Sequence, residues 1–369
     1  MTNLTRRIFL RRLTAAGFSA TGAILLAACS QPQADKPAVI VEPTGAPKPT
    51  TAPTLPAATA ATLGAQPTAA AVAKATTAPA ATNTAVQTAA APTTAPAGLP
   101  YLVVARGGDN PEELVKRTLT ALGGIERFVK PGNNVIIKPN MCVAYHTYEY
   151  AATTNPWVVA ALVKLCLGAG AKSVRVMDFP FGGTAEQAYA ITGIGDQVKA
   201  AGGAMELMTS RKFLKTDIPQ GRDIKSWMIY DEILNADVLI NVPIAKHHSL
   251  ARLTLGMKNM MGTVQNRESI HGNMGQRLAD LAGRIKPALT IIDAVRILMA
   301  NGPTGGNLND VKKLDTLIAS TDIVAADTYA AGLFGVKPEQ LAYIGAGVKS
   351  GVGRSDLANM KIEEIAVSG

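Results

Sequence analysis

The chain has 369 residues and a formal net charge of +9, from 36 lysines and arginines and 27 aspartates and glutamates. Four arginines in residues 1–29 and one net charge in residues 30–98 account for five of these charges, so residues 99–369 keep +4. That charge is ordinary for a soluble surface, and no basic helix with interleaved aromatic residues is present. The composition therefore argues against nucleic acid as a partner.

The first 29 residues carry the pattern of an export signal. Arg6 and Arg7 stand together in TRRIFLR, which resembles a twin-arginine signal, and an apolar run extends from Ala15 to Ala28. This run is too short and too weakly apolar for a stable membrane span. It leads into LAACS, which resembles a lipobox, so residues 1–29 are the predicted signal peptide and Cys29 is the predicted lipidation site. The alternative is an ordinary signal peptide with a chance cysteine.

Residues 30–98 are mostly alanine, proline and threonine and show no periodic apolar pattern. Such a segment cannot bury enough apolar surface to offset the entropy of ordering the chain, so we predict a disordered linker. Behind a lipidated Cys29 this linker would tether a folded domain to the outer face of the cytoplasmic membrane. The expectation is an exported protein of the cell envelope that uses the twin-arginine machinery and a lipid anchor.

Residues 99–369 alternate short apolar runs with helical patterns. This alternation predicts a single α/β domain in which a mostly parallel or mixed sheet is flanked by helices. The predicted strands are Tyr101–Arg106, Asn134–Ile137, Ser173–Met177, Met205–Met208, Val238–Ala245, Leu289–Ile292, Leu317–Ala319 and Ile362–Val367. Cap residues or proline predict helix starts at Asn110-Pro111, Asn155-Pro156, Thr184, Asp322 and Pro338, and periodicity predicts a helix over Gln276–Ile285.

Polar side chains follow four of the predicted strands at the point where each strand ends. They are Lys138 with Asn140, then Asp178, then Lys246 with His247 and His248, then Asp293. In an open α/β sheet, ligands bind in the crevice outside the carboxyl ends of the strands. We expect these groups to meet in one pocket, because unpaired charge is costly in a crevice unless it serves a ligand. The alternative is an internal salt-bridge network.

Two chemistries fit a mixed site of cations and carboxylates. In the first, lysines bind a small anionic substrate while a histidine moves a proton and an aspartate orients it. In the second, histidines and aspartates bind a divalent metal that polarises substrate or water. The predicted substrate-binding residues are Lys138, Asn140, Lys258 and Asn259. The predicted catalytic residues are Lys246, His247 and Asp178. The predicted metal ligands are His247, His248, Asp178 and Asp293.

Two further groups of residues are candidates. Gly182, Gly183 and Thr184 precede a predicted helix, and backbone N–H groups of such a turn can bind an anionic substrate. The alternative is a tight turn in which Thr184 caps the helix. Cys142, just after Asn140, is a candidate ligand or nucleophile, with a buried spectator as the alternative.

Several segments resemble the family described as domain of unknown function 362. They are VIIKPN, MDFP with GGTAEQA, LINVPIAKHH, LGMKNMMG and STDIVAADTYAAGLFG, and the resemblance covers roughly residues 102–365. It implies an α/β domain, and the recurrent family positions correspond to Lys138, Asn140, Asp178, Lys246, His247, Lys258, Asn259 and Asp327. Some relatives carry an added ferredoxin-type domain with cysteine runs. This sequence lacks those runs, so no iron–sulfur cluster is expected.

Taken with the export pattern, the site residues favour a lipid-anchored enzyme, metal- or cofactor-assisted, that acts on a small anionic substrate. A non-catalytic solute-binding lipoprotein is the main alternative, because an anchor and a tether suit it equally well. A structural envelope protein is the third, and it would leave the cluster of charged groups at the strand ends without a purpose.

Overall fold

The computed structural model describes residues 98–368. The predicted export motif at Arg6 and Arg7, the lipidation site at Cys29 and nearly all of the predicted linker lie outside the described residues. Within residues 98–368, no helix has both the length and the apolar character needed to cross a membrane.

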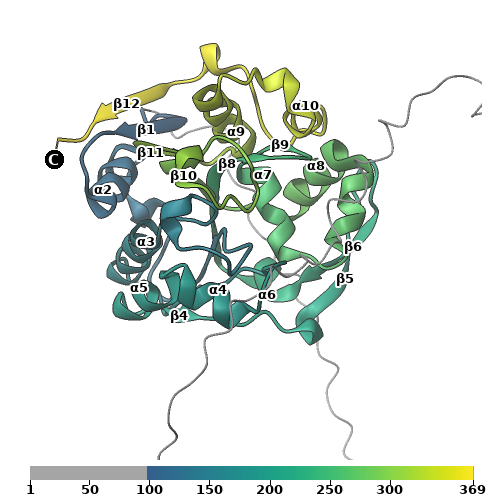
Figure 1. Ribbon diagram of the computed structural model, residues 1–369, viewed down its shortest axis with the longest axis horizontal. Helices are drawn as coiled ribbons and strands as arrows, with labels where there is room; N and C mark the ends of the chain where they lie inside the picture. Colours follow the sequence, from purple (N-terminus) through teal and green to yellow (C-terminus); the bar gives the residue numbers. More distant parts are fainter. Residues whose placement is uncertain (1–97, 369) are drawn as a thin grey trace, which may run out of the picture. The chain divides into compact units, whose positions relative to one another are not determined.

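A mixed β-sheet forms the centre of the domain (Figure 1). Its strands lie in the order β12-β1-β11-β10-β7-β2-β3-β4, and β8 pairs with β10 and with β9. Neighbours are parallel except at β1–β11, β10–β11 and β8–β9. The strands are β1 Leu102–Arg106, β2 Asn134–Pro139, β3 Ser173–Val176, β4 Ala204–Met205, β7 Val238–Val242, β8 Ile244–His248, β9 Arg252–Thr254, β10 Leu289–Leu298, β11 Val311–Ser320 and β12 Ile362–Ala366. The predicted α/β fold with a mostly parallel or mixed sheet is confirmed.

Helices cover both faces of this sheet, as Figure 1 shows. One layer contains α2 Pro111–Ala121, α3 Pro156–Gly168, α4 Ala185–Ile191 and α5 Ile194–Ala200. The other contains α7 Gly256–Asn259, α8 Met274–Ile285, α9 Ile323–Ala331 and α10 Ala342–Lys349. A separate antiparallel pair, β5 Phe213–Asp217 and β6 Ser226–Tyr230, precedes α6 Asp231–Asn235 and packs on the second layer.

Successive residues of each strand serve the two cores in turn, as the period of a β-strand requires. In β1, Val103 and Ala105 belong to the core under α2 and α3, whereas Leu102 and Val104 belong to the core under α8 and α9. Because both faces are covered, such strands consist of nearly continuous apolar residues. For this reason, the continuous apolar runs of the sequence predicted the positions of the strands.

Side-chain caps set the starts of the helices. Asn110 accepts hydrogen bonds from the backbone N–H groups of Glu112 and Glu113, and Asn155 accepts one from Trp157. Proline occupies the first helical position after each of these caps, where its missing N–H has no partner to lose. The predicted starts of α2 and α3 are therefore confirmed.

The sheet differs from the expectation in two strands that reach the site. Pro243 divides the predicted strand Val238–Ala245, because proline cannot donate to a strand ladder, and the chain continues as β7 and β8. The strand predicted to end at Ile292 continues to Leu298, because β11 pairs with it over almost its whole length. Residues that were expected beyond a strand end therefore lie inside β8 and β10.

Candidate functional site

Lys138 and Asp178 form a buried ion pair at the carboxyl ends of β2 and β3. Lys138 Nζ and Asp178 Oδ1 are 2.9 Å apart, and the two side chains are only 1% and 2% exposed. The carboxylate also accepts hydrogen bonds from the backbone N–H groups of Met141, at 2.6 Å, and Phe179, at 2.9 Å. Burial lowers the pKa of Lys138, and the negative charge of Asp178 opposes that effect. The negative charge of Asp178 is therefore the main effect that keeps the buried Lys138 side chain protonated.

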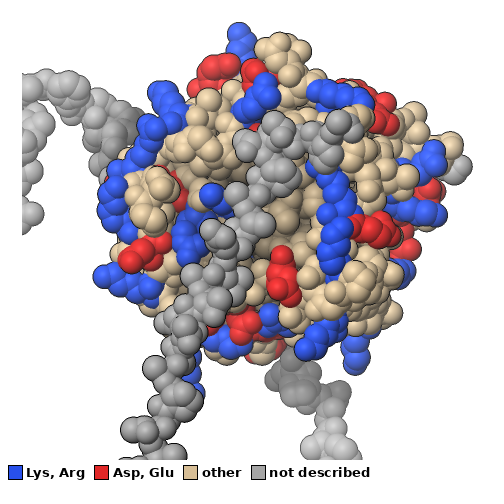
Figure 2. All heavy atoms as spheres, turned by 180° about the vertical axis from the view of Figure 1, so that it is seen from behind, with Lys and Arg blue, Asp and Glu red and all other residues tan. Residues whose placement is uncertain are grey.

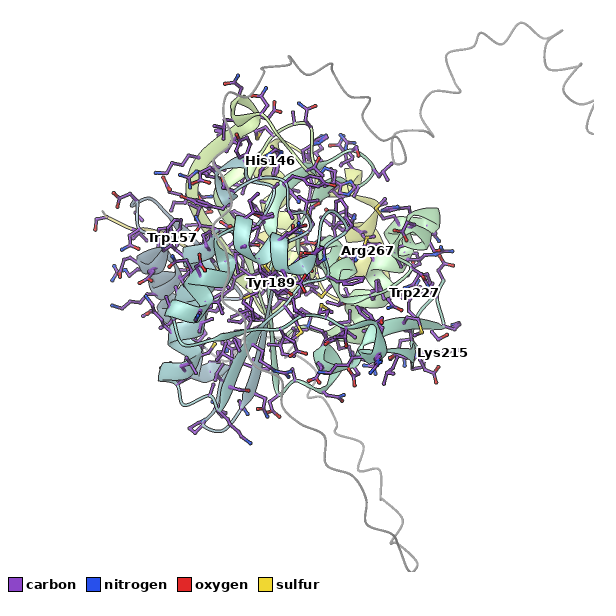
Figure 3. The ribbon with its side chains drawn as sticks, turned by 60° about the horizontal axis from the view of Figure 1, so that its bottom comes forward. His146, Trp157, Tyr189, Lys215, Trp227 and Arg267 are labelled. Carbon is purple, nitrogen blue, oxygen red and sulfur yellow. The ribbon has the colours of Figure 1, made fainter. Side chains whose placement is uncertain are left out.

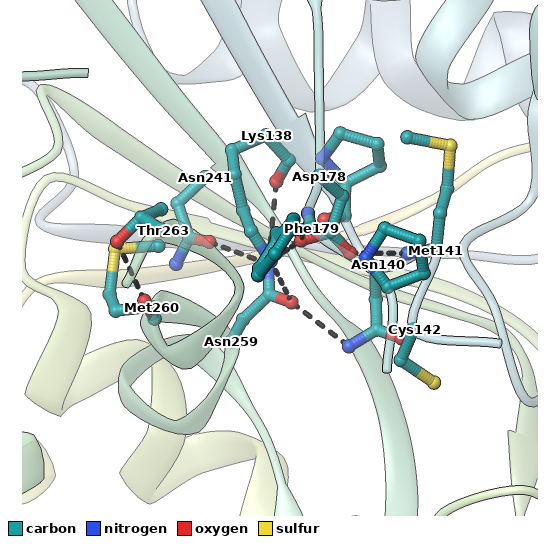
Figure 4. A network of polar contacts seen from close by, with 12 residues as sticks. Lys138, Asn140, Met141, Cys142, Asp178, Phe179, Asn241, Asn259, Met260 and Thr263 are labelled. Atoms are coloured by element: carbon teal, nitrogen blue, oxygen red, sulfur yellow. Dashed lines mark hydrogen bonds and ion pairs between the residues drawn. The ribbon is translucent and has the colours of Figure 1, made fainter. Parts of the chain in front are cut away.

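Asn259 connects the ion pair to neighbouring strands, as the dashed lines of Figure 4 show. Its Oδ1 accepts hydrogen bonds from Lys138 Nζ at 2.8 Å and from Asn140 Nδ2 at 3.0 Å. Its Nδ2 donates to Asn241 Oδ1, in β7, at 2.9 Å. These bonds fix which way the Asn259 amide faces. Asn241 was not among the predicted site residues, although a polar residue inside the apolar run LINVP was a signal for it.

The short helix α7 carries Lys258 and Asn259, and a distant aspartate holds it in place. Asp327, in α9, accepts hydrogen bonds from the backbone N–H groups of Gly256, at 2.6 Å, and Met257, at 2.9 Å. Burial raises the pKa of Asp327 to about 8, and the two amide hydrogen bonds oppose this. A Cβ at Gly256 would lie 2.7 Å from Asp327 Oδ1, so glycine permits the close contact.

Lys246 is buried without a carboxylate partner. Its Nζ donates to the carbonyl oxygens of Ala152, at 2.5 Å, and Pro303, at 2.8 Å, and to Asn140 Oδ1 at 3.3 Å. Its fourth contact is the sulfur of Cys142, at 3.2 Å. The side chain is 1% exposed, and no ion pair to it exists within residues 98–368. The positive charge of Lys246 is therefore solvated by dipoles but not balanced by a carboxylate.

Lys258 is the least satisfied cation of the site. The residue is only 8% exposed, and in the part of the chain that the structure describes its ammonium has no hydrogen bond and no ion pair. Its Nζ is not among the fully enclosed polar atoms that lack a partner there, so it reaches solvent. Burial, followed by the positive charge of Lys246, lowers its pKa to about 7, whereas Cys142 opposes this. With this pKa, the Lys258 amine is present in both its charged and its neutral form near neutral pH.

His248 lies on the same face of β8 as Lys246, because side chains alternate along a strand. Its Nδ1 accepts hydrogen bonds from the backbone N–H groups of Leu250, at 3.1 Å, and Ala251, at 3.3 Å, which leaves Nε2 as the protonated nitrogen. Burial lowers its pKa to about 2, with further effects from Lys258 and Lys246. The imidazole is thus a neutral hydrogen-bond donor beside the lysines.

His247 does not join Lys246, contrary to its predicted catalytic role. It lies one residue further along β8 and so faces the other side of the strand, where Nδ1 accepts a hydrogen bond from the N–H of Gly302 at 3.1 Å. A Cβ at Gly302 would lie 1.9 Å from the carbonyl oxygen of His247, which shows how closely the two segments pack.

The predicted metal ligands do not assemble. Asp293 lies within β10, where its carboxylate accepts hydrogen bonds from the backbone N–H groups of Asn155 and Val295, and burial raises its pKa to about 6. Asp178 is paired with Lys138, and His247 and His248 face opposite sides of β8. Across the described residues no group of three or more His, Cys, Asp or Glu side chains could hold a metal ion. The predicted divalent-metal site is therefore not formed.

The turn of Gly182, Gly183 and Thr184 is satisfied by its own helix. Thr184 Oγ1 accepts a hydrogen bond from the N–H of Gln187, and Gln187 Oε1 accepts one from the N–H of Thr184. This capping box corresponds to the structural alternative for the segment. A Cβ at Gly182 would lie 2.4 Å from the hydroxyl of Tyr145, so the turn packs against protein and offers no open anion cradle.

Arg267 is a site residue that no sequence pattern indicated. It is labelled in Figure 3 and begins the 3-10 helix Arg267–Asn273 that leads into α8. Its Nη1 donates to the carbonyl oxygen of Phe179 at 2.8 Å. Its guanidinium also lies over the Phe179 ring, 4.8 Å from the centroid. Burial lowers the pKa of Arg267, and Asp178 opposes this. The arginine fixes the segment that follows Asp178.

Positive charge exceeds negative charge in this cluster. Its cations are Lys138, Lys246, Lys258 and Arg267. Within residues 98–368, Asp178 is the single carboxylate that forms an ion pair with any of them. The visible part of the molecular surface in Figure 2 shows no such excess of positive charge, because basic and acidic side chains are interspersed there. The imbalance is therefore a property of the buried site.

A further cleft of the described domain lies away from this cluster. It has a volume of about 920 Å³ and runs between β5, α8 and the start of α9. Its two buried carboxylates are satisfied, since Asp280 accepts from the N–H groups of Arg222 and Ile224, and Asp322 caps α9. We place the functional site at the strand ends, where charged groups lack partners.

Much of the domain matches a known protein family. A family model described as domain of unknown function (DUF362) matches residues 135–332, which include the Lys138–Asp178 pair, β8 and α7. The chain belongs to the DUF362 family. Its ion pair, its Asn259 network and its Asp327 cap all lie in the matched part of this DUF362 domain.

Two proteins are similar to this DUF362 chain. The thylakoid-associated protein sll1697 of Synechocystis sp. (strain ATCC 27184 / PCC 6803 / Kazusa) is 28% identical over 253 residues, which cover 64% of this chain and 74% of that protein. The lactate racemase apoprotein from Thermoanaerobacterium thermosaccharolyticum has 11% sequence identity and a TM-score of 0.39. That match covers 63% of this chain and 56% of the racemase, so this chain spans little more than half the length of that protein.

Proposed function

We propose that this DUF362 protein is an enzyme that acts on a small anionic substrate bound beside Lys246, Lys258 and Arg267. The observation that carries the proposal is the excess of buried positive charge. A buried cation without a counter-charge is strongly destabilising, so such a cluster is retained where a ligand supplies the negative charge. A carboxylate or phosphate group has the charge and the acceptor oxygens that lysine and arginine bind.

Lys258 is the proposed proton acceptor. Its pKa of about 7 leaves a large fraction of neutral amine at physiological pH, which is the form that can remove a proton from a bound substrate. Asp327 holds the backbone of α7 and thereby the position of Lys258. His248 Nε2–H, neutral at the same pH, would donate a hydrogen bond to a substrate oxygen.

Anion binding is tested by thermal and urea denaturation of the full chain with inorganic phosphate or oxalate. An anion at 100 times its Kd should stabilise the wild-type protein by about 2.7 kcal/mol. Lys258→Met should be at least as stable as the wild type without anion, because it removes an unbalanced charge. Lys246→Met also leaves the acceptors of Lys246 without a donor, so its stability without anion is compared separately. Both variants should lose most of the anion response.

Lys164→Met is the matched control, because Lys164 is exposed and paired with Glu112 on the surface. It should keep the full anion response. The same response in wild type, Lys246→Met and Lys258→Met would rule out the proposed site. Mass spectrometry of bound anions after prolonged incubation then separates the two functions, since unaltered ligands would identify a non-catalytic solute-binding lipoprotein.

We further propose export through the twin-arginine machinery and a lipid anchor at Cys29 in the cell envelope. Support comes from TRRIFLR and LAACS in the sequence, and a thylakoid-associated relative is compatible with a membrane location. Cys29→Ser should move the protein from the membrane fraction to the soluble fraction, because a lipidated terminus is lost. Arg6→Lys with Arg7→Lys should retain the protein in the cytoplasm. Membrane association that survives Cys29→Ser would contradict the lipid anchor.

A further inference from the structure

Cys142 lies against the ammonium group of a buried lysine. Lys246 Nζ is 3.2 Å from Cys142 Sγ, and the nearest other polar partner of the sulfur is the carbonyl oxygen of Ala152, at 3.7 Å. The backbone around the sulfur is fixed, because the Cys142 carbonyl accepts hydrogen bonds from the N–H groups of Phe181, at 2.8 Å, and Gly182, at 3.3 Å. Cys142 as a whole residue is 8% exposed, so it is buried but not completely enclosed.

The positive charge of Lys246 makes its contact with Cys142 important, because no other partner among residues 98–368 can balance that charge. The three oxygen partners of the ammonium are neutral, belonging to Asn140, Ala152 and Pro303. Cys142 is the one partner of Lys246 in the described domain that can acquire a formal negative charge. A thiolate at 3.2 Å would balance the buried ammonium, and the ammonium would in turn stabilise the thiolate, which is the nucleophilic form of cysteine.

Lys258 is the second, independent observation. It is more than nine-tenths buried, has no hydrogen-bond or ion-pair partner in residues 98–368, and is close enough to Cys142 and Lys246 for their charges to affect its own. An amine without a partner whose pKa responds to the charges of Lys246 and Cys142 can accept the thiol proton, as the base of a nucleophile–base pair does.

We propose that Cys142 is a nucleophile that forms a covalent bond with an electrophilic carbon of a small carboxylate- or phosphate-bearing ligand. The Cys142 S–H proton passes to the Lys258 amine, and Lys246 stabilises the resulting thiolate. The sulfur electron pair then forms an S–C bond while the bond from that carbon to its leaving group breaks, and the leaving group departs with that bonding pair. No oxidant or reductant is needed. The inference rests on the proposed function only for the negative charge of the ligand.

Alkylation at pH 7 tests the nucleophile in the full chain. Iodoacetate has a negative charge and loses iodide as the S–C bond forms, and iodoacetamide is its neutral analogue. Peptide mass spectrometry should find Cys142 alkylated by iodoacetamide at least about tenfold faster than Cys166. Cys166 is fully buried in α3, where burial raises its pKa to about 12, so it is an internal reference for an inert thiol.

Variants separate the roles of the two lysines from a loss of folding. Lys246→Met should slow alkylation of Cys142 by about tenfold or more, and Lys258→Met should slow it by a smaller factor, because the thiolate loses its charge partner or its base. Cys166 should stay slow in both variants, which reports that α3 remains folded. Lys164→Met should leave both rates unchanged. Alkylation of Cys142 no faster than that of Cys166, or an unchanged rate in folded Lys246→Met, would overturn the proposal.

A separate comparison of two alkylation rates measures whether the site prefers an anionic reagent. If the cluster favours anions, the ratio of the iodoacetate rate to the iodoacetamide rate should be several-fold higher at Cys142 than for glutathione in the same buffer. Rapid reaction with iodoacetamide but no such preference and no stabilisation by phosphate or oxalate would support the nucleophile and reject the anionic substrate. Stabilisation by anions with an inert Cys142 would do the reverse.

Discussion

Gly262→Ala should destabilise the protein by about 3–5 kcal/mol, the range expected when a buried ion pair is broken. Gly262 passes directly over the ion pair, and its carbonyl accepts a hydrogen bond from the N–H of Phe179 at 3.2 Å. A Cβ at this position would lie 1.9 Å from Asp178 Oδ1 and 2.6 Å from Lys138 Nζ. Neither group can move without leaving a buried charge unpaired, so the whole contact must open.

Urea denaturation at pH 7 measures this effect, and Gly168→Ala is its control. Gly168 ends α3, and a Cβ there meets no atom within 4 Å. Alanine should therefore be neutral or stabilise by up to about 1 kcal/mol, because it restricts the unfolded chain more than glycine does. A Gly262→Ala protein within 1 kcal/mol of wild type would show that the segment tolerates the methyl group and that the pair is not tightly confined.

Lys258 should make the stability of the protein rise with pH above neutrality. Its pKa is about 7 in the folded protein and has the ordinary value of 10.5 in the unfolded chain, so between these values the unfolded state binds more protons. Stability increases with pH wherever the unfolded state holds more protons, here by up to about 1.4 kcal/mol per pH unit. Below pH 7 both states are protonated, and the full cost of the buried ammonium is present.

Comparing the wild type with Lys258→Met isolates the contribution of the Lys258 amine to the pH dependence of stability. Urea unfolding between pH 6 and pH 10 should show the difference in free energy of unfolding narrowing above pH 7, because the wild type loses its buried charge and the variant has none to lose. Anion affinity should change in the opposite sense, falling in wild type as pH rises through 7 and staying flatter in the variant. A pH-independent difference between the two proteins would mean that Lys258 keeps its proton throughout.

Much of the site was predictable because strand ends are visible in sequence. Lys138, Asn140 and Asp178 follow apolar runs that form adjacent parallel strands, and parallel neighbours bring their ends together. Lys246 joins them because β8 runs beside β10. No pattern in the sequence showed the Asp327 contact with α7, since it joins segments 71 residues apart.

The errors arose from strand lengths and from the alternation of side chains. Asp293 was placed beyond a strand end because the apolar run stops at Ile292, but β11 extends the pairing and leaves Asp293 inside β10. His247 is predicted as catalytic and both His247 and His248 as metal ligands, although residues adjacent in a strand face opposite sides. Only His248 shares a face with Lys246. Strand length depends on the partner strand, which local sequence does not specify.

The contact between Asp327 and α7 also sets an order of assembly. Gly256 and Met257 are synthesised 71 and 70 residues before the aspartate that holds their N–H groups. A nascent chain that has emerged only as far as β10 lacks this anchor, so Lys258 reaches its final position late in synthesis. Ligand loading is therefore expected to follow completion of the C-terminal third of the chain, and truncation before α9 would abolish it even with every other site residue present.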